Sequence, residues 1–302
     1  MPATYSLVSL VNEAKPGVSP YTSKSYFYSL KRAAPISVQN QLGSGQSDNK
    51  VRIRWIKDHQ KTLLRLREYT PSVQRATVTA LLIISNHLYG EKSKSSQEYH
   101  RVFTDLSAVV NEAERANEKS ETQLENWMPL EEIQAYAAVL PTDRPKDRRN
   151  RLVAYLYAFQ PPARNDYGGV ELLTDFSQIQ PGINYLFLED GNPINFIFQD
   201  YKTSGKYGQM TVPVSLELAT EIKEFLDGRE EGYLFGKPLT KSQVQYSMKA
   251  VFAGTGKHVT INLLRHIWVS EGMDLDQRKK EKELAGSMMH SLGMQETYAK
   301  KW

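Results

Sequence analysis

Hydrophobic residues recur at helical spacing along much of the chain, and this pattern predicts a mainly α-helical protein. Thr70 followed by Pro71 marks a helix start, because Thr is a favourable N-cap and Pro fits the first helical turn. The apolar positions that follow at helical spacing are Val73, Ala76, Ala80, Leu81 and Ile84. With a similar stripe from Tyr99 to Ala113 and a basic helix expected from Val51 to Glu68, residues 51–126 are predicted to form a small helical domain.

A different pattern appears in the part of the chain after residue 126. The runs 185–188 and 195–198 flank Asp190 and Gly191, a dipeptide that favours the tight turn of a β-hairpin. Residues 210–214 have the composition of a third strand. These runs predict a small antiparallel sheet.

Helices precede and follow this sheet. Pro129 opens one helix, and a second ends before Pro161 because proline cannot continue a helical ladder. Thr240, with a Gln three residues later, and Thr260 are expected to cap two further helices. Residues 127–302 are therefore predicted to form a second domain that is mostly α, and the fold class is α+β.

The first fifty residues lack such periodicity. They are rich in Ser, Pro and Tyr, and the stretch 41–47 has the composition of a flexible linker. Residues 1–50 are therefore expected to form a flexible N-terminal arm and linker.

Charge is unevenly distributed along the 302 residues, although the net charge is only +4. Residues 51–75 carry seven Lys or Arg against two acids, and residues 143–164 carry six against two. By contrast, residues 101–132 carry eight acids against three bases. Such segregation suits a surface that faces phosphates, while solvated helix faces explain any single cluster equally well.

Several classes of site are excluded by residue usage. The chain has no Cys, which excludes disulfides, thiol catalysis and Cys-ligated metal sites. Its six His show no zinc-binding spacing, so no metal site is expected. No apolar run is long enough for a membrane span and no signal peptide is recognisable, so we expect an intracellular protein of the cytoplasm or nucleus.

A set of polar residues in the second half of the chain could carry chemistry. The candidates are Arg164, Lys202, Lys206, Asn262, Arg265, His290 and Tyr298. Taken singly, most have an ordinary structural explanation, such as a helix cap, a solvated turn or a buried aromatic. Arg265 is the exception, because its sequence neighbours Leu264 and Ile267 are apolar and its charge then needs a strong partner.

Together these residues suit the cleavage of a phosphodiester. Arg164 and Arg265 can hold the non-bridging oxygens, and His290 can donate a further hydrogen bond. Lys202 or Lys206 can protonate the departing 5′-oxygen as a general acid. A tyrosine hydroxyl has a pKa of about 10, so Tyr298 needs such an electropositive pocket in order to attack.

The order Arg, Lys, Arg, His, Tyr resembles that of the tyrosine recombinases of the phage-integrase type. Arg164 precedes Arg265 by 101 residues, and Tyr298 follows Arg265 by 33, which is similar to the family's typical intervals. The Pro-Pro-x-Arg-Asn-Asp-Tyr and Tyr-Lys-Thr motifs look most like recombinases from mobile elements and large DNA viruses of eukaryotes. The resemblance covers residues 127–302, whereas residues 51–126 match the family's core-binding domain only in position and class.

The resemblance implies a site-specific recombinase or integrase that works through a covalent 3′-phosphotyrosine, without metal, ATP or a small-molecule cofactor. It implies a C-shaped clamp on double-stranded DNA and four copies assembled on two DNA sites. Under this interpretation Arg52, Arg54, Lys57 and Lys61 of the basic segment lie on phosphates or in the major groove.

The sequence departs from the family at two positions, and alternatives stay open. Asn262 stands where the family usually has His, and Tyr167, beside Asp166, stands where it often has Glu. Lys202 is preferred to Lys206 as the acid because Lys-Thr after a strand is the family's form. A type IB topoisomerase, which uses the same residue set, is the main alternative. A DNA-binding relative that has lost catalysis is the third.

Overall fold

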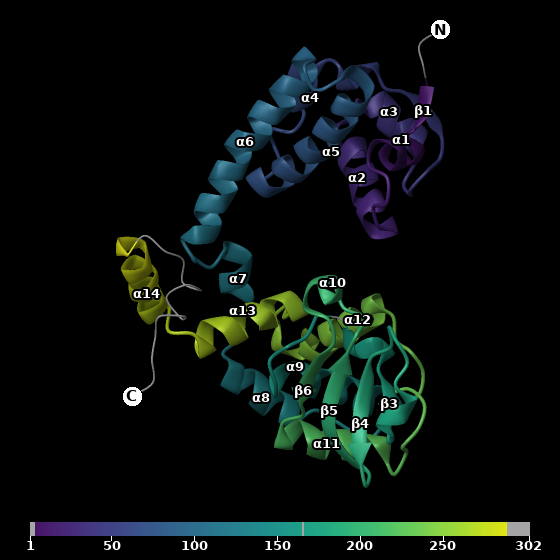
Figure 1. The fold of residues 1–302 in the computed structure, drawn as a ribbon, viewed down its shortest axis with the longest axis vertical. Coiled ribbons are helices and arrows are strands. Elements are labelled where there is room, and N and C mark those ends of the chain that lie inside the picture. Colours follow the sequence, from purple (N-terminus) through teal and green to yellow (C-terminus); the bar gives the residue numbers. More distant parts are fainter. Residues whose placement is uncertain (1–3, 165, 289–302) are drawn as a thin grey trace. The chain divides into compact units, whose positions relative to one another are not determined.

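The computed structural model describes residues 4–164 and 166–288, and the chain divides into two compact units, Met1–Glu118 and Lys119–Trp302 (Figure 1). The described residues are mainly helical with two small sheets, which confirms the α+β class. Residues 119–126, which we expected in the first domain, belong to the second unit. They are held there because the Nζ of Lys119 lies 3.7 Å from the ring centroid of Trp127, and Asn126 Oδ1 accepts from the His258 backbone N–H at 2.6 Å.

The first unit is a group of helices with a short two-stranded ribbon. Its elements are β1 (Thr4–Ser6), α1 (Leu7–Ala14), α2 (Pro20–Ala33), α3 (Ile36–Leu42), β2 (Lys50–Arg52), η1 (Arg54–Ile56), α4 (His59–Leu64), α5 (Pro71–Tyr89) and α6 (Lys94–Arg115). Helices α5 and α6 pack against each other, and α2 packs on α5. The helix predicted from Thr70 and Pro71 is confirmed as α5.

The expected flexible arm over residues 1–50 is wrong for most of its length. Helices α1, α2 and α3 occupy much of it, and Leu7, Leu10, Phe27 and Leu30 are fully buried. The apolar residues are few, but they fall on one face of each helix, and serine caps start α1 and α2. Some of the Ser and Tyr residues that suggested disorder belong to the packed structure, since Ser23 and Ser29 are buried and Tyr26 and Tyr28 pack against the core.

The basic segment is also different from the expected single helix over residues 51–68. It forms strand β2, the short turn η1 and helix α4. Val51 and Ile53 are buried while Arg52 and Arg54 are exposed, so the burial alternates with the period of a strand. This segment is therefore a strand rather than a helix because the buried residues Val51 and Ile53 are separated by one exposed residue.

The second unit packs helices around one mixed sheet. Its helices are α7 (Glu121–Asn126), α8 (Leu130–Ala138), α9 (Pro145–Ala158), η2 (Asp166–Gly169), η3 (Phe176–Gln178), α10 (Ser204–Tyr207), α11 (Leu216–Leu226), α12 (Lys241–Phe252), η4 (Ala253–Thr255), α13 (Ile261–Gly272) and α14 (Leu275–Ser287). Its strands are β3 (Glu171–Leu173), β4 (Tyr185–Glu189), β5 (Asn192–Phe198) and β6 (Met210–Pro213). The expected caps Thr240 and Thr260 are confirmed at the starts of α12 and α13.

The sheet has the order β3-β4-β5-β6. Strands β4, β5 and β6 are antiparallel, and Asp190 and Gly191 turn the predicted hairpin with positive φ angles of 48° and 71°. Strand β3, which the sequence pattern did not reveal, pairs with β4 in parallel. The sheet is therefore mixed rather than purely antiparallel, and the three-residue length of β3 explains why periodicity missed it.

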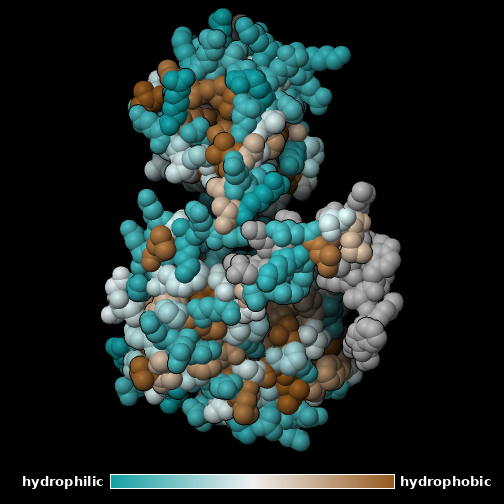
Figure 2. Space-filling view, turned by 90° about the vertical axis from the view of Figure 1, so that its left-hand side faces the viewer, coloured by the Kyte–Doolittle hydropathy of each residue, from teal (hydrophilic) through white to brown (hydrophobic). Residues whose placement is uncertain are grey.

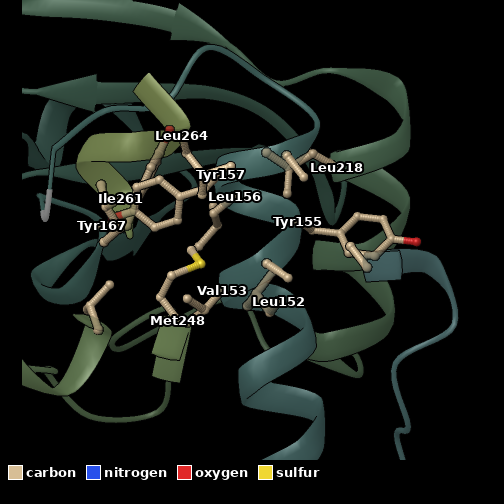
Figure 3. Close-up of a cluster of buried hydrophobic side chains, with 14 of the residues drawn as sticks. Leu152, Val153, Tyr155, Leu156, Tyr157, Tyr167, Leu218, Met248, Ile261 and Leu264 are labelled. Atoms are coloured by element: carbon tan, nitrogen blue, oxygen red, sulfur yellow. The ribbon is translucent and has the colours of Figure 1, made fainter. Parts of the chain in front are cut away.

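Helix α9 runs through the core of the second unit and contacts α8, α11, α12 and α13. Figure 3 shows Tyr157 of α9 and the buried Tyr167 beside Ile261 and Leu264 of α13, whereas Tyr155 points away from them, on the side of α9 where Leu218 of α11 lies. The rings of Tyr157 and Tyr167 meet edge to face with centroids 5.3 Å apart. The core therefore fixes α13 against the C-terminal end of α9.

Hydrophilic side chains cover most of the face drawn in Figure 2, and hydrophobic residues are gathered there in small separate patches. In the described ranges, no helix combines the length and the apolar character that crossing a membrane requires.

Gly168 marks a close approach between η2 and the segment that leads into α12. The Leu239 backbone N–H donates to the Gly168 carbonyl at 2.8 Å, and a Cβ on Gly168 would collide with the Leu239 carbonyl. Gly168→Ala is therefore expected to destabilise the second unit by about 1–3 kcal/mol, in the range of overpacked cores. Urea unfolding of the full chain measures this.

The adjacent glycine supplies the matched control. A Cβ on Gly169 meets nothing within 4 Å, so Gly169→Ala should unfold close to the wild-type midpoint. Equal stability of the two variants would contradict the packing described here.

Candidate functional site

A cavity of about 730 Å³ opens in the second unit, and four of the predicted site residues line it. These are Arg164, Lys202, Asn262 and Arg265. They come from the loop after α9, the turn after β5 and the first two turns of α13. No carboxylate is among the described residues that line the cavity, so its walls are strongly cationic.

Arg164 is held by its backbone rather than by its side chain. The hydroxyl of Tyr157, in the last turn of α9, donates to the Arg164 carbonyl at 2.6 Å. The Tyr157 backbone carbonyl in turn accepts a 3.0 Å hydrogen bond from the indole Nε1 of Trp268 on α13. Burial raises the pKa of Tyr157 well above the ordinary tyrosine value, so this hydroxyl stays a donor. The guanidinium of Arg164 is left exposed toward the cavity.

Arg265 is presented by the amphipathic helix α13. The Thr260 hydroxyl caps this helix by accepting from the Leu263 N–H at 3.1 Å. Leu264 and Ile267 are buried in the core, while Arg265 is half-buried and lines the cavity. The apolar neighbours of Arg265 in sequence therefore point to the other side of the helix. The expectation that these apolar side chains enclose the Arg265 charge is wrong. The charge instead faces a cavity that other cations also line.

The structure separates the two candidate acids. Lys202 lines the cavity, whereas Lys206 does not, and the Nζ of Lys206 lies 4.9 Å from the centroid of the Tyr207 ring. The hydroxyl of Tyr201 closes this turn by donating to the Gly208 carbonyl at 2.8 Å. Both lysines are exposed, so the turn offers only Lys202 to the cavity.

Further cavity residues were not singled out by the sequence. Helix α12 contributes Ser242, Gln245, Tyr246 and Lys249, whose spacing places them on one helical face. His258, in the loop before α13, lines the cavity as well. The polar face of α12 was the available signal, but an amphipathic helix shows only that this face is not core, and not what it faces.

Asp166 is the carboxylate that interacts electrostatically with both arginines. Burial raises the pKa of this carboxyl, the charge of Asp200 acts in the same direction, and Lys241, Arg164 and Arg265 act in the opposite one. The Nζ of Lys241 lies 3.9 Å from its Oδ1. Both arginines thus act electrostatically on one carboxylate whose side chain is 9% exposed and which is not among the described residues that line the cavity.

Tyr167, which stands where the family often has Glu, belongs to the core instead. It is 1% exposed, and its hydroxyl accepts a 2.6 Å hydrogen bond from the Gln160 amide. Burial raises the pKa of Tyr167 to about 12, so its hydroxyl remains protonated. Tyr167 packs the site from behind and does not supply a charge.

Two groups of predicted residues remain. His290 and Tyr298 fall outside the described residues. Arg52, Arg54, Lys57 and Lys61 are exposed on the first unit. Two of these cations have local partners, since Lys57 lies 5.9 Å from the Tyr89 ring centroid and Lys61 pairs with Asp58 at 3.4 Å.

No protein-family model matches the chain, and no curated protein matches its sequence. The resemblance to tyrosine recombinases therefore depends on the ordered residues and on the cavity that gathers four of them. Within the ranges that the structure describes, no group of three or more His, Asp or Glu side chains is arranged to hold a metal ion.

The pKa of Asp166 makes a prediction about stability and pH. Because its folded-state pKa is raised, the stability linked to this group is present at low pH and is lost as the pH rises through that pKa. Asp166→Asn is neutral throughout, so it should melt at or above the wild-type temperature near neutral pH. This advantage should vanish as the pH falls. Thermal melts between about pH 4 and pH 8, which span ordinary carboxyl titration, measure it.

Asp175 provides a control, because its pKa is shifted in the opposite direction from the pKa of Asp166. Its carboxylate accepts from the Ser177 hydroxyl at 2.7 Å and backbone N–H at 2.8 Å, and these bonds lower its pKa. Asp175→Asn should therefore be less stable than the wild type near neutral pH and approach it in acid. If Asp166→Asn behaves like Asp175→Asn, the ion pair with Lys241 outweighs the cost of burial.

Proposed function

We propose that this chain cleaves and rejoins double-stranded DNA by a tyrosine-recombinase type of reaction, with Tyr298 as nucleophile. The observation that carries the proposal is the cavity where Arg164, Lys202 and Arg265, distant in sequence, come together. A phosphodiester carries its charge on two non-bridging oxygens. Paired guanidinium groups bind such oxygens in bidentate fashion, which suits this set of side chains.

The arginines are suited to the transition state as well as to the bound diester. Negative charge on the equatorial oxygens must be stabilised as the tyrosine oxygen attacks phosphorus, and preorganised donors do this without reorganisation. Arg164 is preorganised by the Tyr157 hydroxyl at its carbonyl, and Arg265 by its place on a capped helix. Asp166 is a positioning residue in this proposal, since its charge acts on both arginines.

The chemical step exchanges one ester for another. The Tyr298 hydroxyl loses its proton to solvent, and its oxygen forms a bond to phosphorus while the bond from phosphorus to the 5′-oxygen breaks. Lys202 gives its proton to that leaving oxygen. The product is a 3′-phosphotyrosine and a free 5′-hydroxyl. Attack by a 5′-hydroxyl reverses the step, and the bond energy is conserved in the phosphotyrosine. Asn262 lies in the cavity as a hydrogen-bond donor to the phosphate.

Strand exchange is the function in which we place this chemistry. Four copies would assemble on two DNA sites, with Arg52, Arg54, Lys57 and Lys61 of the first unit on the phosphate backbone. The exposure of these four side chains supports such contacts. Efficient relaxation of a supercoiled plasmid by single copies, without strand exchange, would instead indicate a type IB topoisomerase.

The nucleophile is tested by covalent trapping. The full chain is incubated with nicked duplexes of randomised sequence, and denaturant-stable adducts are captured, sequenced and digested to locate the modified peptide. The wild type should carry a 3′-nucleotide on Tyr298, and Tyr298→Phe should form no adduct because it lacks the attacking oxygen. The captured sequences also supply a defined substrate.

Tyr246 provides a matched control for this experiment. It lines the cavity and is 63% exposed, so it is the alternative phenol among the described residues that line this site. Tyr246→Phe should still form the adduct on Tyr298. Loss of the adduct in Tyr246→Phe, with retention in Tyr298→Phe, would overturn the assignment of the nucleophile.

The general acid is tested with the two lysines of the β5–α10 turn. Lys202→Ala should slow cleavage by about 10²–10⁴-fold, the usual contribution of general acid catalysis, whereas Lys206→Ala should remain close to the wild-type rate. A substrate with sulfur in place of the 5′-oxygen should restore Lys202→Ala, because a thiolate leaves without a proton. If this substrate restored the cleavage rate of Lys206→Ala but not that of Lys202→Ala, the general acid would be Lys206.

A further inference from the structure

A second cationic cavity lies in the first unit, and the cleavage reaction does not use it. It has a volume of about 500 Å³. Strand β2, turn η1 and helix α3 form its walls, and Lys50, Arg52 and Arg54 line it together with Trp55. No acidic residue is among the described residues that line it. Such a cavity has the size of a small-ligand site and a strong preference for anions.

The local sequence explains why three cations share this cavity. Along β2 and into η1, Val51 and Ile53 are 0% and 5% exposed, and the residues between and beside them point outward. The alternation places Lys50, Arg52 and Arg54 on the outer side of one short ribbon. In the described part of the chain these three side chains have no carboxylate within ion-pair distance, so their charges are uncompensated.

Trp55 supplies an independent indication of a ligand. Its side chain is 9% exposed, and its indole N–H is buried without a hydrogen-bond partner among the described residues. Buried donors in native proteins almost always have an acceptor, so an orphan of this kind calls for one. Trp55 lines the same cavity as the three cations, and a shift of its indole ring would bring the buried N–H against an acceptor oxygen of an anion bound there.

The polar residues on the opposite wall fit the same ligand. Ser37 and Gln41 are one turn apart on α3 and both line the cavity with exposed side chains. A hydroxyl and an amide add neutral donors to the three cationic ones. A tetrahedral anion with several acceptor oxygens uses such a set more fully than a chloride or a single carboxylate does.

From these observations we infer that the first unit holds a phosphate-binding site formed by Lys50, Arg52, Arg54 and Trp55. Its ligand is a phosphate group, supplied by a free phosphate ester or by the backbone of duplex DNA. The site separates the four cations of the basic segment into two groups. Arg52 and Arg54 bind the phosphate, while Lys57 and Lys61 lie outside the cavity. The inference does not depend on the proposed cleavage reaction, but its DNA source deepens the backbone contacts proposed above for Arg52 and Arg54.

The test measures the signal of the Trp55 indole N–H, the donor without a partner, in the full chain. The four tryptophans are labelled with ¹⁵N at the indole, and the Trp55 signal is identified by its loss in Trp55→Phe. Inorganic phosphate, a nucleoside 5′-monophosphate and a short duplex are titrated separately, with sodium chloride at matched ionic strength as a blank. We expect the Trp55 signal to move downfield and to saturate in at least one of the phosphate arms.

Two double variants decide whether the cavity is responsible. Arg52→Ala with Arg54→Ala should weaken the response at least about tenfold, since each charged hydrogen bond lost costs roughly a factor of ten or more. Lys92→Ala with Lys94→Ala removes two exposed cations of the same unit outside the cavity and should leave the titration unchanged.

A comparison of the three phosphate titrations also identifies the source of the phosphate. A response to inorganic phosphate or the mononucleotide supports a free ester, and a response to the duplex alone supports the DNA backbone. The inference is overturned if Trp55 does not move in any phosphate arm, if chloride moves it equally, or if the arginine variant responds like the wild type. None of these results alters the covalent trapping on Tyr298, so the two proposals fail separately.

Discussion

Two hydrogen bonds in series hold the candidate site together. The Trp268 indole on α13 donates to the Tyr157 carbonyl at 3.0 Å, and the Tyr157 hydroxyl donates to the Arg164 carbonyl at 2.6 Å. Arg265 lies on the same helix as Trp268, so this series connects the two arginines through the buried end of α9. The placement of the Arg164 backbone relative to the helix that carries Arg265 thus depends on the core.

The cationic cavity has an electrostatic cost that the rest of the site has to balance. Arg164, Lys202, Lys249 and Arg265 line it, and like charges in a shared cavity repel one another. Asp166 is the nearby carboxylate, yet its raised pKa shows that burial opposes its own ionisation. The repulsion among the cations and the burial of the carboxylate both lower stability, and such a cost is typical of a site that binds an anion.

Local signals predicted much of the second unit. Thr240 and Thr260 cap helices where their side chains suggested, and Asp190 with Gly191 turns the hairpin, because caps and turns depend on a few adjacent residues. Arg164, Lys202 and Arg265 were recognised from their order along the chain, and the cavity brings them together. Lys206, the less favoured of the two candidate acids by sequence, does not line the cavity, because of a turn that periodicity does not describe.

The failures have a common physical cause. The N-terminal helices depend on a few apolar residues that become a core only when α1, α2 and α5 pack together, and composition does not show this. His258 and the polar face of α12 reach the cavity through tertiary packing. Tyr167 was noted because it stands where tyrosine recombinases often have Glu, but a tyrosine at 1% exposure is core.

The central claim is that the arginines act on the charge of the phosphodiester. Once trapping supplies a defined substrate, Arg265→Ala can be compared on the natural diester and on one with an uncharged methylphosphonate at the scissile position. The account predicts a loss of about 10²–10³-fold on the diester, the usual effect of removing one such donor, and a much smaller loss on the methylphosphonate. An equal loss on both substrates would contradict it.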